Sequence, residues 1–128
     1  MMRHIGITLA LIAAILFISG CNGDIKSLRV TATAYTSRVI ETDSSPFVAA
    51  WGDKLKPGVK SIAVSGDLEE LGLTHGSYVW IDGLPGRYKV LDRMHSRWEK
   101  KIDIYMGRKL DSAIQWGQKE VVIRWVTD

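Results

Sequence analysis

The expected fold of this chain is set by one stretch, Leu91-Asp-Arg-Met-His-Ser-Arg-Trp-Glu-Lys-Lys-Ile-Asp-Ile-Tyr105. It holds two aspartates, Asp92 and Asp103, eleven residues apart. Asp92 follows an apolar pair at a predicted strand end, where a side chain leaves the sheet and can face a ligand. Around Asp103, period-two alternation places Ile102 and Ile104 on one face and Asp103 with Tyr105 on the other. A carboxylate beside an aromatic ring is typical of sugar sites, and also of ordinary half-buried strands.

The composition predicts one small exported domain. The chain has 128 residues, a formal net charge of +3 and a single cysteine. This length supports one modest hydrophobic core, which must fold without a disulfide inside the chain. No basic block is long enough to indicate a nucleic-acid partner. The oligomeric state is left open by the sequence.

The first twenty residues are typical of a secretory signal. An apolar run from Ile5 to Ile18 follows Arg3 and His4 and ends in small residues before Cys21. Ile18-Ser19-Gly20-Cys21 resembles a bacterial lipoprotein box, which implies that Cys21 is lipidated and anchors the protein to a membrane. The alternative is a plain signal peptide with a stray cysteine.

This resemblance gives the expected boundaries and location. Residues 1–20 are the expected signal peptide, residues 21–27 a tether, and residues 28–128 the folded domain. Asparagine at position 22, rather than aspartate, implies by the sorting rule for such lipoproteins an outer-membrane anchor facing the periplasm. The bacterial cell envelope is therefore the expected location.

Alternation and turn signals predict a small barrel of mixed strands. Strands are expected over 28–36, 61–64, 77–82, 87–92 and 120–126, with 77–82 and 87–92 forming a hairpin. A helical turn is expected over 66–71. A helix is expected over 108–116, where Leu110, Ala113 and Ile114 form an apolar face. In the last strand, Trp125 shares its face with Ile123 and is expected in the core. The absence of a βαβ rhythm favours a mainly β barrel with two short helices.

A long segment over residues 37–60 has no sustained period. A segment of this length in so small a domain is usually functional or disordered, and its apolar content favours a packed binding loop. Thr42, Asp43 and Asp53 are candidate hydrogen-bonding residues for a glycan, while solvated loop polarity is the slightly favoured alternative.

Five segments together resemble the three-aspartate domain, the double-psi β-barrel shared by the membrane-bound lytic transglycosylase A family and small cell-wall proteins. The matching segments are Ala32-Thr-Ala-Tyr-Thr36, Ile62-Ala-Val-Ser-Gly-Asp-Leu68, Val90-Leu-Asp92, Ile102-Asp-Ile-Tyr105 and the closing stretch from Ala113 to Trp125. The resemblance implies a six-stranded double-psi barrel with Asp67, Asp92 and Asp103 as its three aspartates. The chain departs from the family pattern after Asp92, where the usual glycine-rich run is replaced by bulkier and more basic residues.

The resemblance implies non-hydrolytic cleavage of the glycan strand of peptidoglycan, between the MurNAc and GlcNAc sugars. A lytic transglycosylase needs no external water, because the C6 hydroxyl of the muramyl sugar attacks its own anomeric carbon. One carboxyl can then act first as acid and later as base, and motif position assigns this role to Asp103. The pKa of Asp103 must then be raised by desolvation or by a like charge, for which Asp92 is the natural source. No cofactor is expected. No His and carboxylate cluster at ligand spacing predicts a metal site.

The remaining site residues each have a structural alternative. Asp67 with Glu70 three positions later fits a helix capping box as well as a site. No second ligand lies at metal-binding spacing from His95, so this histidine is expected to act as a hydrogen-bonding partner. The residues expected to touch glycan are Tyr35, Thr36, Thr42, Asp43, Asp53, His95, Trp98 and Tyr105. A basic rim of Arg93, Arg97, Lys100 and Lys101 suits the carboxylates of peptidoglycan, although a solvated charged face is equally ordinary.

Two functions of another class remain open. The first is a wall-binding module that retains the barrel without turnover, which the bulky replacement after Asp92 favours. The second is an accessory lipoprotein that docks a cell-wall enzyme through the long loop.

Overall fold

The computed structural model describes residues 23–37 and 47–127 of the chain. The predicted signal segment, Cys21, Thr42 and Asp43 lie outside the described residues. Within the described ranges, no helix has the length and apolar character needed to cross a membrane.

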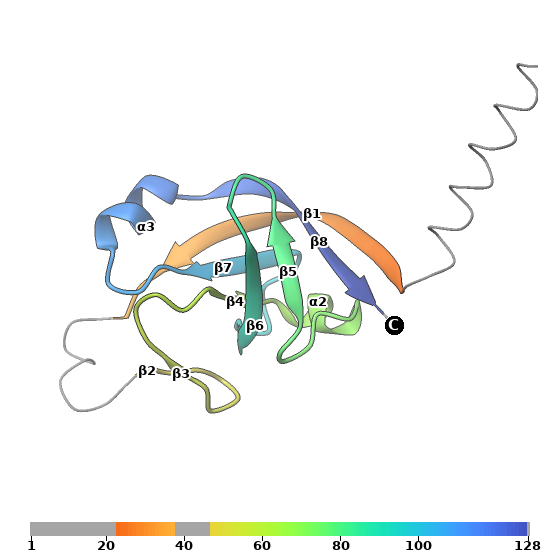
Figure 1. The fold of residues 1–128 in the computed structure, drawn as a ribbon, viewed down its shortest axis with the longest axis horizontal. Coiled ribbons are helices and arrows are strands. Elements are labelled where there is room, and N and C mark those ends of the chain that lie inside the picture. The colour runs from red at the N-terminus through yellow and green to blue at the C-terminus, as the bar shows by residue number, and fades with distance from the viewer. Residues whose placement is uncertain (1–22, 38–46, 128) are drawn as a thin grey trace, which may run out of the picture.

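The described residues form a closed barrel of six strands (Figure 1). In barrel order the strands are β1 (Asp24–Tyr35), β7 (Lys101–Tyr105), β4 (Ser61–Val64), β6 (Arg87–Arg93), β5 (Tyr78–Ile81) and β8 (Lys119–Thr127). Two helices, α2 (Gly66–Glu70) and α3 (Leu110–Trp116), and a small sheet of β2 (Phe47–Val48) and β3 (Lys54–Leu55) complete the described fold. The predicted fold class is confirmed: a six-stranded double-psi β-barrel with two short helices.

The barrel is built from two chain halves of the same topology. The first half contributes β1, β4 and β5, and the second contributes β6, β7 and β8. β1 pairs with β7 in parallel as β6 pairs with β4, while β4 and β7 are antiparallel to each other. α2 follows β4 as α3 follows β7. The sequence carries no recognisable repeat, so this twofold relation is visible only in the topology.

The core lies inside the barrel and follows the predicted alternation. Within the described residues it contains Val30, Ala32, Ile62, Val64, Leu68, Leu73, Val79, Ile81, Tyr88, Val90, Ile102, Ile104, Ile123 and Trp125. The structure therefore confirms the predicted inward phase of the first strand, of Ile102 and Ile104, and of Trp125. Burial of apolar side chains from all six strands of the barrel is the main stabilising contribution in a chain with no internal disulfide.

The predicted apolar face of α3 is wrong. Leu110 and Ile114 are 59% and 67% exposed, and no residue of the helix is fully buried. The helix is instead attached through Trp116, which packs partly buried against the core and donates from Nε1 to the carbonyl of Ala32 at 3.2 Å. A helix of seven residues has only two turns, so one large side chain is enough to fix it on the barrel.

Candidate functional site

Four residues in register form a row across the outer surface of four neighbouring strands. Asp92 of β6 pairs with Ala63 of β4, Ala63 pairs with Asp103 of β7, and Asp103 pairs with Thr33 of β1. Neighbouring strands lie about 4.8 Å apart, so the backbones of the two aspartates are separated by roughly 10 Å. The sheet thus places the two predicted carboxylates on either side of one small methyl group.

A β-bulge gives Asp92 its direction. Val90 pairs with Ile62, and the next pair is Asp92 with Ala63, so Leu91 is the extra residue. Without the bulge, Asp92 would share the inward phase of Val90 and point into the core. Leu91 instead packs against a second, outer hydrophobic cluster under the β2–β3 sheet, and Asp92 follows it onto the outer surface.

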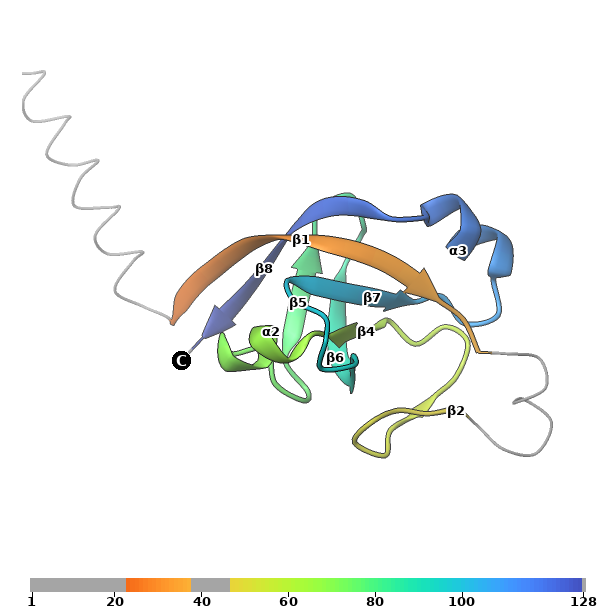
Figure 2. The same ribbon diagram turned by 180° about the vertical axis from the view of Figure 1, so that it is seen from behind.

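The row forms the floor of an open cleft of about 260 Å³. Its lining consists of Tyr35, Ala63, Asp92, Arg93, Met94, His95, Trp98 and Asp103. We call this site the cleft. β7 at its centre lies toward the viewer in Figure 2, which looks at the barrel from behind.

Asp92 is held by three hydrogen bonds. Its Oδ1 accepts from the backbone N–H groups of Ala50 at 2.8 Å and Arg93 at 2.9 Å, and its Oδ2 accepts from the Tyr35 hydroxyl at 3.4 Å. These donors fix the orientation of the carboxylate. Asp92 thus bonds backbone amides, as an aspartate with a purely structural role would, and the same carboxylate lines the cleft. The bond from Ala50 also fixes the β2–β3 sheet beside the site.

Asp103 has the environment of a poorly solvated acid. Desolvation by burial is the main cause that raises the pKa of Asp103 above its ordinary range, and the charge of Asp92 raises it further. A hydrogen bond from the Thr33 hydroxyl to Oδ1 at 3.0 Å and the charge of Lys101 oppose this rise. In the described part of the chain, no hydrogen bond joins the two carboxyl groups, so Asp92 acts on Asp103 through charge and not through a shared proton.

The two tyrosines predicted to touch glycan lie in different places. Tyr35 lines the cleft, and burial together with the charge of Asp92 raises the pKa of its hydroxyl, which therefore stays protonated as a donor. Tyr105 is 3% exposed, packs with Ala49 and Leu55 under the β2–β3 sheet, and shares a 2.5 Å hydrogen bond with Ser37 Oγ. The prediction that Tyr105 faces the cleft is wrong, because the β2–β3 sheet covers it.

His95 and Trp98 reach the cleft from the segment between β6 and β7. The Nδ1 atom of His95 accepts from the backbone N–H of Arg97 at 3.1 Å, so Nε2 carries the proton of the neutral ring. The Trp98 ring is 37% exposed, and Lys101 Nζ lies 3.7 Å from its centroid. Both residues line the cleft as the sequence predicts, with Arg93 beside them.

Asp67 is neither the helix cap nor part of the cleft lining. The N-cap of α2 is Ser65, so the predicted capping box is wrong. The Oδ2 atom of Asp67 accepts from the backbone N–H of Lys100 at 2.8 Å, and Lys100 has a positive φ of 45°. A non-glycine residue in this conformation needs support from its surroundings. Asp67 therefore holds the entry to β7.

Asp53 has a structural partner. Its Oδ2 lies 2.5 Å from His75 Nε2, and His75 stacks on Trp51 with a ring-centroid distance of 4.9 Å. Arg93 lies over the Trp51 ring, 4.8 Å from its centroid, and donates two hydrogen bonds to Glu69. Asp53 thus ties the β2–β3 sheet to the barrel and does not line the cleft. Thr36, directly after β1, does not line it either.

Sequence reasoning missed Thr33 and Ala63. Thr33 shares the outward phase of Tyr35, so the alternation of the first strand contained its signal. Ala63 lies in a segment that reads as wholly apolar, and only the register with Asp92 and Asp103 reveals its role. Within residues 23–37 and 47–127, no three His, Cys, Asp or Glu side chains are grouped closely enough to hold a metal ion.

Comparison with known proteins supports the fold. No family model and no curated protein matches the chain. Among solved structures, the chain is similar to the crystal structure of an apo expansin from Clavibacter michiganensis, with a TM-score of 0.55 and 17% sequence identity. The match covers 80% of this chain and 52% of the expansin, so the chain spans about half the length of that protein. The chain thus has a double-psi barrel of a related fold, and membership of the three-aspartate family stays a prediction.

Proposed function

We propose that this protein binds the glycan strand of peptidoglycan in the cleft and cleaves it as a lytic transglycosylase, with Asp103 as acid and base. One observation carries the proposal: a poorly solvated carboxyl with a raised pKa lies in an open cleft beside a second, well-bonded carboxylate. A related fold in an expansin supports the coarser part, a role on cell-wall polysaccharide. Lipidation at Cys21 and an outer-membrane location belong to the same proposal.

The reaction requires one proton to leave Asp103 and return to it. The protonated carboxyl donates to the glycosidic oxygen as the bond to the anomeric carbon breaks. The C6 hydroxyl of the muramyl sugar then attacks that carbon, and its proton passes to the Asp103 carboxylate. The product is an anhydro-muramyl end, and no water is consumed. A raised pKa of Asp103 favours the protonated form that the first step of this reaction needs.

The other cleft residues suit the charge and shape of the substrate. Asp92, fixed in position by its three donors, is placed to stabilise positive charge that develops at the anomeric carbon. The Nε2–H of His95 is a donor for a sugar hydroxyl, and the Trp98 ring offers an apolar surface to a sugar face. Arg93 at the rim is already paired with Glu69, so a carboxylate of a peptide stem would compete with Glu69 for it.

Glycan binding without turnover is the second candidate. All the oxygens of Asp92 already accept bonds from the protein, which is also what a carboxylate with a purely structural role would do. In this case the cleft retains a glycan strand and Asp103 donates a hydrogen bond to it. An accessory role toward another cell-wall enzyme would need the segment around residues 37–60.

Digestion of purified sacculi separates these candidates. The native protein is expected to release anhydro-muropeptides, which are lighter by one water than hydrolysis products. Asp103→Asn keeps the shape of the side chain and removes its ionisable proton, so it is expected to bind sacculi and release no product. Binding by the native protein without any product between pH 5 and 8 would leave only the binding function.

Asp67→Asn is the matched control. It makes the same chemical change at an aspartate that does not line the cleft, and the amide oxygen can still accept from Lys100. We expect it to retain activity. If Asp67→Asn abolishes cleavage while the protein stays folded, the assignment of the reaction to the cleft is wrong.

A further inference from the structure

A second exposed surface lies on the opposite wall of the barrel from the cleft. The cleft is centred on β7 and β4. In the closed barrel, β5 lies three strands away from β7, and β8 lies three strands away from β4, so β5 and β8 form the opposite wall. The β5–β6 hairpin lies toward the viewer in Figure 1, whereas β7 does so in Figure 2. Any ligand of β5 therefore meets a surface that shares no residue with the cleft lining.

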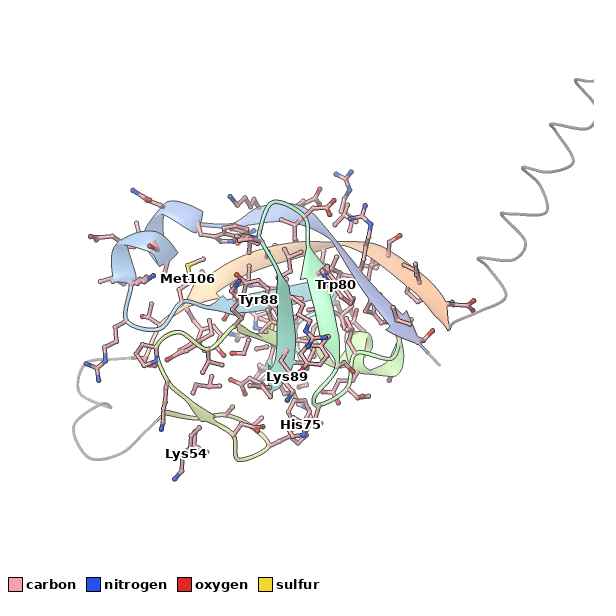
Figure 3. All side chains as sticks on the ribbon, in the orientation of Figure 1. Lys54, His75, Trp80, Tyr88, Lys89 and Met106 are labelled. Carbon is pink, nitrogen blue, oxygen red and sulfur yellow. The ribbon has the colours of Figure 1, made fainter. Side chains whose placement is uncertain are left out.

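Two large aromatic side chains point outward from β5. Val79 and Ile81 are buried in the core, while Tyr78 and Trp80, which alternate with them, are 39% and 44% exposed. Residues two apart on a strand are about 6.6 Å apart along it, so the two rings form a short aromatic strip. Figure 3 labels Trp80 on this strand and Lys89 on the neighbouring strand β6.

Basic side chains surround this strip on both neighbouring strands. Tyr78 pairs with Lys89, and Trp80 lies between Arg87 of β6 and Arg124 of β8. The Arg87 guanidinium carbon lies 3.8 Å from the centroid of the Tyr78 ring, and Lys89 Nζ lies 5.7 Å from it. The rings and the cations thus form one continuous surface, which we call the β5 face.

The charge of the β5 face is only partly neutralised. Asp82 forms an ion pair with Arg124. No carboxylate in the described ranges forms an ion pair with Arg87 or Lys89. Their two positive charges are therefore available to an anionic ligand, next to an aromatic surface that water solvates poorly.

We infer that the β5 face is a second binding surface, for a polysaccharide that carries carboxylate groups. Aromatic rings pack against the C–H faces of sugar rings, and guanidinium and ammonium groups pair with carboxylates. The two available cations, Arg87 and Lys89, lie two residues apart on β6 and suit a polymer that carries carboxylates along its length. Single-stranded nucleic acid sites instead follow the backbone with a positively charged groove. The inference does not depend on cleavage in the cleft.

Affinity electrophoresis of the full-length protein through gels containing polygalacturonate tests the inference, with neutral xylan gels for comparison. We expect retention by polygalacturonate that weakens with added salt, and little retention by xylan. Trp80→Ala and the pair Arg87→Gln with Lys89→Gln are each expected to weaken retention by roughly fivefold to tenfold. Trp80→Phe keeps an aromatic ring and is expected to retain most of the binding.

Ile114→Ala is the matched control, because it removes an exposed apolar side chain of α3 that belongs neither to the β5 face nor to the cleft lining. It is expected to leave the retention unchanged, and circular dichroism checks that each variant is folded. The inference is overturned if Trp80→Ala weakens retention no more than Ile114→Ala does, or if both gels retain the protein equally. Tighter binding to a single-stranded oligonucleotide than to polygalacturonate would overturn it in favour of nucleic acid.

Discussion

The two halves of the barrel share a topology and differ in chemistry. In the row that forms the cleft floor, Thr33 of the first half occupies the place that Asp92 occupies in the second, and Ala63 occupies the place of Asp103. Both carboxylates therefore come from the second half, while the first supplies a hydroxyl donor and a methyl floor. The scaffold provides two pairs of equivalent positions, and the residues placed there decide which positions are acidic.

The helices of the two halves differ in the same way. α2 buries Leu68 completely, whereas α3 buries none of its residues fully and exposes Leu110 and Ile114. The first half thus contributes more to packing through its helix, and the second contributes the chemistry of the site. Equivalent topology does not imply equivalent energetic roles.

The strongest test of this comparison moves a carboxylate from one half to the other. The double substitution Asp103→Ala with Ala63→Asp places the acid at the equivalent position of β4, directly beside Asp92 and one strand further from Thr33. We expect cleavage of sacculi to fall by at least about a hundredfold, as for Asp103→Ala alone, because the donor and the neighbours of the acid are lost. Near-native activity of the double variant in a folded protein would show that the halves are interchangeable.

The next effect concerns stability and compares the two helices. Leu68→Ala is expected to lower the free energy of unfolding by about 2–5 kcal/mol, because it leaves a cavity in the core. Ile114→Ala in α3 is the matched control and is expected to change it by less than about 0.5 kcal/mol. Urea unfolding followed by tryptophan fluorescence measures both. Equal losses would contradict the unequal packing of the helices.

Asp103 should cost the protein stability at neutral pH. Folding raises its pKa, so the folded state favours the protonated form. Below the unfolded pKa of about 3.9 both states are protonated and the cost is absent; it grows as the pH rises through the folded pKa. Asp103→Asn is therefore expected to have a higher Tm than the native protein at pH 7, with the gap closing toward pH 3.

The same measurement on Asp111→Asn provides the control, because Asp111 is exposed on α3. Its Tm should follow that of the native protein at every pH. A native protein that is more stable than Asp103→Asn at pH 7 would mean that Asp103 is stabilised in its ionised form.

The smallest effect is expected from the hydroxyl of Thr33. The hydrogen bond from Thr33 lowers the pKa of Asp103. Thr33→Val removes this bond, so the pKa of Asp103 should rise further above its ordinary value. The alkaline limb of the pH–activity profile should then move to higher pH, with roughly a fivefold loss of rate at the optimum. Thr31→Val, two residues earlier on the outer face of β1, should change neither. A downward move of the limb would contradict the assigned hydrogen bond.

Much of this fold was predictable because alternation is a local property. The phases of the strands around Val30, Ile102 and Trp125 follow from period two alone, and the Gly83–Gly86 stretch gives the β5–β6 hairpin. The two aspartates at the site were also predictable, since each ends or interrupts an apolar run. The position of Ala63 between the two aspartates was not predictable, because it depends on the register between strands far apart in sequence.

The failures of sequence reasoning have physical causes of the same kind. The bulge at Leu91 has no local signature, although it decides that Asp92 points outward. Tyr105 has the right phase for the cleft, but a separate small sheet folds over it. The apolar spacing in α3 is correct for a buried helix, and tertiary packing uses only Trp116. In each case, a contact from a distant segment overrides the local pattern.

The bond between Ala50 and Asp92 links the cleft to the β2–β3 sheet thermodynamically. The carboxylate that faces the cleft also holds the backbone of that sheet, so opening of residues 47–55 removes one of the three hydrogen bonds that fix Asp92. A ligand that requires this geometry will therefore slow amide exchange at Ala50, by a factor that grows with its free concentration relative to Kd. Occupancy of the cleft can thus be followed at a backbone amide that the ligand itself need not touch.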